Sequence, residues 1–407
     1  MIEKILSISR KSFSEIVKLR REFHQYPELA FQELNTGKIV ANELEKLGIR
    51  VKNGVGKTGL VGILDGDPPA VSKMRIRDRR VVALRADMDA LPINEESDVP
   101  FASKNPGKMH ACGHDAHMAM LIGAARILSE LKTGLNGTVK FIFQPSEEKN
   151  PGGAPSMIKD GALSNPDVDV IFGQHMTTEL TVGKFGFKAG PLMASADEIY
   201  ITVIGKGGHG ASPHKTIDPV IIAAQVISSL QNVISRMRNP LEPSVLTIGS
   251  IHGGSATNVI PDEVKLSGTF RAMNGNWRKK GLSLIRQTAE EVAKGFGGKC
   301  KVEISNGYPV LVNSENETSL ARESAKKLFG EKSTVEMNPV MSAEDFAYFL
   351  QETPGTFWWI GAGNKKTGAT ASIHSSKFKI DENALMHGSA LLAFLTMQYL
   401  DSRDRKD

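Results

Sequence analysis

The residues best suited to metal chemistry are concentrated in ten consecutive positions, MHACGHDAHM, from Met109 to Met118. This segment holds three of the ten histidines in the chain and one of its two cysteines. Imidazole and thiolate groups both bind zinc-like ions, and polar groups of this kind need partners when they are buried. A surface helix that happens to be rich in histidine explains the segment equally well on its own. The choice depends on whether distant segments supply further ligands. The candidate donors here are His110, Cys112, His114, Asp115 and His117.

Three apolar runs elsewhere in the chain each lead into acidic or imidazole side chains. The runs cover Arg80–Ala86, Val139–Gln144 and Val168–Gln174, and the side chains that follow them are Asp87 and Asp89, Glu147 and Glu148, and His175. Continuous apolar runs are typical of buried strands, and open α/β sheets carry their sites beyond the carboxyl ends of strands. We therefore expect these polar side chains to gather at one edge of a sheet. Asp87 and Asp89 would share a face of an extended strand.

This number of donors suits two metal ions held close together, with one bridging group and an open position for water. The adjacent pair Glu147 and Glu148 is informative because neighbouring side chains diverge. One can ligate a metal while the other takes a proton from water. A solvated acidic turn is the alternative for this pair, but an apolar strand precedes it and Gly152-Gly153 follow it. The candidate set is Asp89, Cys112, His114, Glu147, Glu148, His175 and His374.

The elements that position these residues alternate between strand and helix patterns. Apolar spacing predicts two helices over Ile2–Leu47 with a break at Tyr26-Pro27, and one after His114 with a one-sided apolar stripe. Helices between the strands favour a mostly parallel sheet with crossover connections. Further elements are expected at Thr318–Leu328 (helix), Phe357–Gly361 (strand) and Asn383–Tyr399 (helix).

The pattern changes from about Lys188. The predicted elements are a strand at Glu198–Gly205, a helix from Asp218-Pro219 to Met237, strands at Val245–His252 and Glu263–Arg271, a helix at Trp277–Phe296 and a strand at Cys300–Ser305. The order βαββαβ is that of a ferredoxin-like unit. Because the first pattern resumes after Tyr308, we expect an inserted domain at 188–306 within a catalytic domain formed by 1–187 and 307–407.

Composition narrows the class of protein. A chain of 407 residues is long enough for two domains. The 50 basic and 45 acidic residues are interspersed, which argues against nucleic-acid binding, and the basic run Lys73–Arg80 is interpreted as a solvated loop without a role. Cys112 and Cys300 do not form a disulfide framework and fit a reducing compartment. No apolar stretch has membrane-spanning length and no signal peptide is recognisable, so we expect a cytoplasmic protein with no membrane partner.

Eight ordered motifs resemble those of the aminoacylase and carboxypeptidase family of co-catalytic metallopeptidases. They are HQYPELAFQE, LRADMDALP, MHACGHDAHM, FQPSEE, GKGGHGASPH, TNVIPD, MSAEDFAYF and HSSKF. The chain is similar to the branch that contains hippurate hydrolases, auxin-conjugate amidohydrolases and archaeal thermostable carboxypeptidases. The resemblance implies two divalent metal ions, with zinc favoured over manganese or cobalt. It matches Glu147 to the general base and Asp89 to a carboxylate that orients a ligand. The implied ligands are Cys112, His114, Glu148, His175 and His374.

The resemblance extends to the inserted domain. His209 matches a histidine that polarises the scissile carbonyl, often across a dimer interface. Asn258 and Arg271 match substrate contacts, and the fork of donors on Arg271 suits a carboxylate. A simple glycine turn around His209 and a strand-edge charge at Arg271 are the structural alternatives. The resemblance also makes this domain the dimerisation surface, so we expect a homodimer or homotetramer in which His209 completes the neighbour's site.

The expected reaction is metal-assisted hydrolysis of an amide in N-acyl amino acids or in short peptides with a free C-terminal carboxylate. Glu147 takes a proton from the attacking water and passes it to the leaving amine, while metal and His209 stabilise the oxyanion. An aminopeptidase-like or deacetylating relative would recognise a different group. A non-catalytic metal-binding protein would leave Glu147 without a role, and a papain-like use of Cys112 conflicts with its match to a ligand.

Overall fold

The computed structural model describes residues 1–67 and 79–402, which form two compact units. The first unit comprises Met1–Gly190, Val312–Asn338 and the chain from Asp345 onward. The second comprises Pro191–Leu311 and Pro339–Glu344. The chain thus leaves the first unit three residues later than the expected position 187, and the second unit takes a further short segment from the C-terminal part. Residues 73–78 of the basic run lie outside the described residues.

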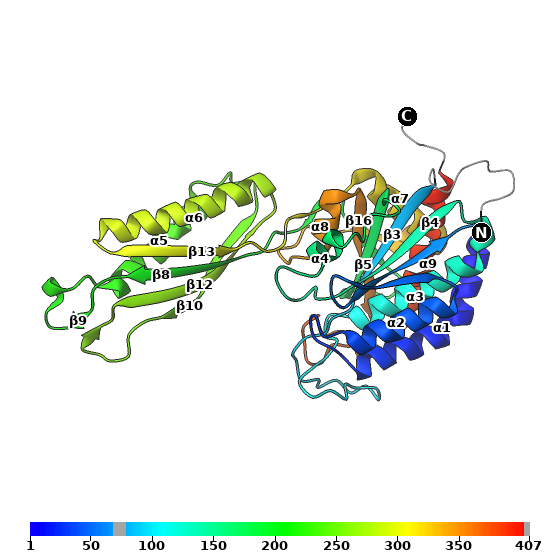
Figure 1. The fold of residues 1–407 in the computed structure, drawn as a ribbon, viewed down its shortest axis with the longest axis horizontal. Helices are drawn as coiled ribbons and strands as arrows, with labels where there is room; N and C mark the ends of the chain where they lie inside the picture. Colours follow the sequence, from blue (N-terminus) through cyan, green and yellow to red (C-terminus); the bar gives the residue numbers. More distant parts are fainter. Residues whose placement is uncertain (68–78, 403–407) are drawn as a thin grey trace. The chain divides into compact units, whose positions relative to one another are not determined.

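A mixed eight-stranded sheet runs through the first unit (Figure 1). In spatial order its strands are β1 (Arg50–Val55), β2 (Gly59–Asp65), β4 (Gly137–Gln144), β3 (Arg80–Asp87), β5 (Val170–Thr181), β16 (Gly355–Gly363), β6 (Phe185–Phe187) and β15 (Thr334–Glu336). The four central strands, β4, β3, β5 and β16, are parallel, which confirms the predicted mostly parallel core. β2 is antiparallel to both of its neighbours, so the sheet becomes antiparallel toward that edge.

Five helices share one hydrophobic core with this sheet. They are α1 (Ile2–Gln25), α2 (Leu34–Lys46), α3 (His114–Glu130), α7 (Glu315–Phe329) and α9 (Asn383–Asp401). The predicted break between the first two helices is confirmed. The prediction of a one-sided apolar stripe on α3 is wrong, because α3 contacts α1, α9 and β3, and every residue from His114 to Ala125 is buried. Two short helices, α4 (Ala154–Lys159) and α8 (Phe346–Glu352), pack against each other.

The second unit is a four-stranded antiparallel sheet with α5 and α6 on one face (Figure 1). Its main elements are β8 (Asp197–Ile204), α5 (Pro219–Ser235), β10 (Ser244–His252), β12 (Glu263–Ala272), α6 (Gly275–Gly295) and β13 (Lys299–Ser305). Their chain order and the strand order β10-β12-β8-β13 confirm the ferredoxin-like unit. Asp218 caps α5, since its Oδ1 accepts a hydrogen bond from the backbone N–H of Val220 at 2.9 Å.

Short elements complete the description. β9 (Gly208–His209) pairs with β11 (Val259–Ile260), and β7 (Gly190–Met193) pairs with β14 (Leu311–Asn313) where the chain passes between the units. The 3₁₀ turns are η2 (Lys132–Gly134), η3 (Pro213–Lys215) and η4 (Glu331–Ser333). Within residues 1–67 and 79–402, no helix is both long and apolar enough to cross a membrane.

A candidate metal centre

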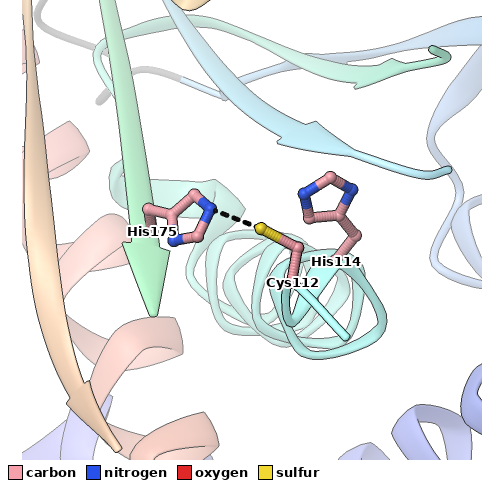
Figure 2. A group of neighbouring side chains, drawn as sticks. All are labelled: Cys112, His114 and His175. Atoms are coloured by element: carbon pink, nitrogen blue, oxygen red, sulfur yellow. Dashed lines mark hydrogen bonds between the residues drawn. The ribbon is translucent and has the colours of Figure 1, made fainter. Parts of the chain in front are cut away.

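Five side chains from distant parts of the first unit meet beside the start of α3. They are Cys112, His114, Glu148, His175 and His374, the five ligands that the resemblance implies. Figure 2 shows Cys112 and His114 at the N-terminal end of α3, with His175 on β5 turned toward the sulfur. The Cys112 Sγ atom lies 3.4 Å from His175 Nε2 and 3.3 Å from His374 Nε2. His374 Nε2 is in turn 3.2 Å from Glu148 Oε1.

Two left-handed backbone positions bring these ligands together. Gly113, between the two α3 donors, has a φ of +88° at the N-cap of the helix, a conformation that glycine adopts without strain. His374 has a φ of +64°, which is uncommon for a residue with a side chain. Its backbone N–H donates to the carbonyl of Ala111 at 2.8 Å. That bond ties the loop before α9 to the residue that immediately precedes Cys112.

His175 lies inside a strand, whereas the sequence predicted a strand that ends at Gln174. β5 continues to Thr181 because its pairing with β16 persists beyond this point. The Nδ1 atom of His175 donates to the Met176 carbonyl at 2.8 Å, which leaves Nε2 facing Cys112. Burial, together with the neighbouring His117, lowers the pKa of His175 well below 6.5. The imidazole is therefore neutral, which is the form that ligates a metal.

His114 is buried among carboxylates. Its Nδ1 lies 3.4 Å from Asp89 Oδ1 and 3.7 Å from Asp87 Oδ1, and its Nε2 makes no hydrogen bond to any residue that the structure describes. Burial lowers the pKa of His114, but Asp87, Asp89 and Glu148 outweigh burial and raise it to about 10. The carboxylates thus create a negative potential that favours a bound cation.

The donors fit divalent metal ions. Ligand atoms lie within 4.8 Å of one another in one group of Cys112, His114 and His175, and in a second group of Cys112, Glu148 and His374. Burial, Glu148 and Glu147 raise the pKa of the Cys112 thiol well above 9.0. A thiolate at this position therefore requires a nearby positive charge, which a metal ion supplies. Thiolate, imidazole and carboxylate together are a zinc-type ligand set.

Comparison with known proteins decides the family. Residues 83–398 match the family described as Peptidase family M20/M25/M40. The chain belongs to this family. It is 40% identical to thermostable carboxypeptidase 1 of Saccharolobus solfataricus over 98% of this chain and 99% of that protein. It is 40% identical to IAA-amino acid hydrolase ILR1-like 2 of Arabidopsis thaliana over 98% of this chain and 88% of that protein.

A solved structure agrees with this assignment. The Bacillus subtilis YXEP protein, described as a dinuclear metal binding peptidase from the M20 family, superposes with a TM-score of 0.82 at 36% identity, over 96% of this chain and 99% of that chain. As an M20/M25/M40 peptidase the chain is a hydrolase that carries out metal-dependent amide hydrolysis. The expected fold class and family are thereby confirmed.

The turn after β4 places Glu147 and Glu148 beside the centre of this M20/M25/M40 peptidase. Both carboxylates belong to a third group of neighbouring donors, with His114. The backbone N–H groups of Glu147 and Glu148 donate to Asp89 Oδ1 and Oδ2 at 2.8 and 3.0 Å. The family resemblance implied that Asp89 orients a metal ligand. In the structure its carboxylate accepts hydrogen bonds from the turn that carries Glu147 and Glu148, and it also lies next to His114.

The structure places the other predicted site residues in the second unit. His209 pairs with Val259 across β9 and β11, and Gly210 N–H donates to the Asn258 carbonyl at 2.8 Å, so His209 and Asn258 are neighbours. His209 Nδ1 accepts from the Ala211 N–H at 3.0 Å, which puts the ring proton on Nε2. Arg271 lies on β12, an inner strand, and its Nη1 donates to the Met341 carbonyl at 2.9 Å.

Two candidate donors from the histidine-rich segment have other partners. His117 Nδ1 donates to Asp87 Oδ1 at 2.7 Å, and His117 Nε2 accepts from the Met176 N–H at 2.9 Å, so neither nitrogen is available to a metal. Asp115 Oδ2 lies 2.7 Å from Arg20 Nε and 2.8 Å from His24 Nδ1, which ties α3 to α1. The hydrogen bonds of His117 exclude it as a metal ligand, and the contacts of Asp115 give that residue a structural role. His24 is buried in the same network.

Asp345, which sequence reasoning assigned no role, supports the loop after Glu148. Its Oδ1 accepts from Arg85 Nη2 and Gln144 Nε2, both at 2.8 Å, and its Oδ2 accepts from the Ala154 N–H at 3.0 Å. Gly152 approaches this carboxylate so closely that a Cβ would lie 2.2 Å from Oδ2. The motif MSAEDFAYF was the available signal, since a carboxylate directly before an apolar run needs several donors if it is buried.

Proposed function

We propose that this peptidase hydrolyses N-acyl amino acids or short peptides with a free C-terminal carboxylate, using two divalent metal ions, most simply zinc. The observation that carries the proposal is the pair of donor groups that share Cys112, with Glu147 beside them. A shared thiolate suits two ions held close together. The names of the relatives, a carboxypeptidase and an amino-acid conjugate hydrolase, support a substrate with an amide bond next to a carboxylate.

Separate residues of the chain have separate roles in the proposed reaction. Bound metal ions supply Lewis acidity toward the carbonyl and lower the pKa of a coordinated water. Glu148 serves as a ligand, and Glu147 acts as the general base that takes the water proton and returns it to the leaving amine. Asp89 holds both residues through their backbone N–H groups, so the base and the ligand keep a constant separation. Such preorganisation contributes to the rate because little reorganisation is needed during reaction.

The second unit supplies the remaining contacts in this proposal. With its proton on Nε2, His209 is a hydrogen-bond donor suited to an oxyanion, and Asn258 beside it is suited to a polar group of the substrate. The further guanidinium nitrogens of Arg271 suit the substrate carboxylate. The sheet of this unit has open edges at β10 and β13, which supports a homodimer or homotetramer with His209 acting in the neighbour's site.

We also propose a cytoplasmic location, which the free thiols of Cys112 and Cys300 support. The second candidate function is a deacetylating or aminopeptidase-like activity that recognises another group in place of the carboxylate. The two candidates differ in what Arg271 binds.

The proposal is tested with metal analysis and a panel of N-acyl amino acids, their carboxamides and benzyloxycarbonyl dipeptides. We expect about two metal ions per chain and hydrolysis only where the carboxylate is free. Arg271→Ala should lower kcat/KM about 10- to 100-fold for free carboxylates, since a charge-assisted hydrogen bond contributes about 1.5–3 kcal/mol. Arg286→Ala is the matched control, because Arg286 also donates to a backbone carbonyl, that of Val302. Equal turnover of the carboxamides would favour the second candidate.

A further inference from the structure

We propose that Glu33 is a positioning residue that holds the turn carrying Glu147. The inference rests on the proposed role of Glu147 as the base and extends it to a segment, HQYPELAFQE, that the reaction itself does not use. Glu33 lies immediately before α2 and is fully buried. Its Oε1 atom accepts a hydrogen bond from the backbone N–H of Ser146 at 2.9 Å. Ser146 directly precedes Glu147.

The turn after β4 is held by carboxylates from outside it. Ser146 has a φ of +54°, a left-handed conformation that residues with side chains rarely adopt. Such a backbone persists only when its surroundings over-determine it. The Oγ of Ser146 is buried and makes no hydrogen bond within the described chain, so its own side chain does not hold the turn. Successive N–H groups of Ser146, Glu147 and Glu148 are instead accepted by Glu33 and Asp89.

The Glu33 carboxylate is itself fixed from two further directions. Thr58 Oγ1 donates to Oε2 at 2.5 Å, and the Phe31 N–H donates to Oε1 at 3.0 Å. A carboxylate that accepts from three donors has little freedom to move, and burying it is costly unless its oxygens accept such hydrogen bonds. Asp89 also faces His114, whereas Glu33 is outside every group of neighbouring metal donors among the described residues. The hydrogen bond from Ser146 to Glu33 therefore positions the turn, and Glu33 does not itself take part in a group of metal donors.

Two substitutions separate the effect of the length of the Glu33 side chain from the effect of its charge. Glu33→Gln keeps the side-chain length, and its carbonyl oxygen still accepts from Ser146 and Phe31 while its amide faces a Thr58 hydroxyl that can turn to accept. Glu33→Asp keeps the charge but is one methylene shorter, so it loses Ser146. Positioning predicts that Glu33→Asp lowers kcat about 10- to 100-fold with little change in KM or metal content, as misplacement of a catalytic group does. Glu33→Gln should stay within about fivefold of the wild-type kcat.

Hydrogen exchange supplies a readout that does not depend on turnover. The backbone amides of residues 146–148 should exchange about tenfold faster or more in Glu33→Asp, and at the wild-type rate in Glu33→Gln. Glu28 is the matched control, because its carboxylate in the same segment accepts the N–H groups of Asn35 and Thr36 at 2.9 and 2.8 Å, on α2 and away from the turn. Glu28→Asp should leave kcat and these amides unchanged.

The outcomes distinguish the two proposals. If Glu147→Gln is inactive but Glu33→Asp keeps the wild-type kcat and exchange, the positioning role is wrong while the base assignment stands. If Glu33→Gln loses kcat and Glu33→Asp does not, the charge of the side chain matters rather than its length, and the inference is also overturned. If Glu147→Gln is fully active, Glu147 is not the general base and the proposed function is wrong on that point. The hydrogen-exchange result alone then decides whether Glu33 holds the turn.

Discussion

His117 donates a hydrogen bond from Nδ1 to Oδ1 of Asp87 at 2.7 Å, and the other oxygen of Asp87 accepts from Arg85 Nη1 at 2.6 Å. The second nitrogen of His117 accepts the N–H of Met176. The carbonyl of Met176 accepts from His175 Nδ1. A continuous chain of bonds therefore runs from the buried arginine to the imidazole that faces Cys112, and it sets the position of β5 against α3.

Removing this support should weaken metal binding. We expect His117→Ala to lower metal affinity about 10- to 100-fold, the usual effect of losing a group that orients a ligand. Competition with a chromophoric chelator measures the affinity directly. His252→Ala, at an exposed position in the second unit, is the control and should leave it unchanged. Wild-type affinity in a folded His117→Ala protein would show that β5 holds His175 without this bond.

Glu147→Gln should retain its metal and lose turnover. A carboxamide cannot accept the water proton, and the loss of a general base costs about two or more orders of magnitude in kcat. Elemental analysis and steady-state kinetics on the same sample check both parts. A variant with near-wild-type kcat contradicts the assignment of the base, and a variant without metal assigns Glu147 to binding instead.

Chelation should remove activity reversibly and also lower stability. Metal that binds only the folded state stabilises it by about 2.7 kcal/mol at a free concentration 100 times Kd. The thermal midpoint should therefore fall on treatment with a chelator and recover when zinc, manganese or cobalt is returned. Full activity in protein shown by elemental analysis to be free of metal would exclude a metal-dependent reaction.

Mixing two inactive variants tests whether His209 acts in the neighbouring subunit. We expect Glu147→Gln and His209→Ala each to be inactive or slow, because they remove the base and an oxyanion donor. Hybrid dimers formed by subunit exchange would then contain one intact site, and activity in an equal mixture should return toward about a quarter of the wild-type value. Demonstrated exchange without recovered activity would place His209 in the site of its own chain.

Lys140 predicts a specific pH dependence of stability. Its Nζ donates to the carbonyls of Ala162 and Ser164 at 3.1 and 2.6 Å, and burial lowers its pKa to about 8 despite the attraction of Asp167. Between that pKa and about 10.4 in the unfolded chain, the unfolded state binds more protons at this group. The free energy of unfolding should therefore rise with pH in this window.

Lys140→Met isolates that contribution. Denaturation of both proteins at pH values from about 7 to 10 should show the wild type gaining stability relative to Lys140→Met as the pH increases. Lys299→Met provides a control, because Lys299 is an exposed lysine on β13, in the second unit. A wild-type curve parallel to that of Lys140→Met would show that Lys140 titrates normally.

Local sequence patterns predicted most of the elements. The apolar runs of β3 and β4 and the N-cap of α5 are encoded by consecutive residues, so their positions could be predicted within a few residues. The extent of β5 could not, because its polar continuation is held by β16, where His175 pairs with Trp359 and Thr177 with Gly361. Burial of α3 on all sides likewise depends on α1 and α9, which are remote in the chain.

The sequence by itself determined the kind of chemistry and the family, because thiolate, imidazole and carboxylate donors in ordered motifs narrow the possibilities strongly. Only the tertiary structure decided which donors of the histidine-rich segment face the centre. Asp87 and Met176 occupy both nitrogens of His117, while Cys112 and His114 remain directed at Glu148 and His374. The physical reason is that each polar atom has a limited number of hydrogen bonds, and the partners that use them come from elements far away in the sequence.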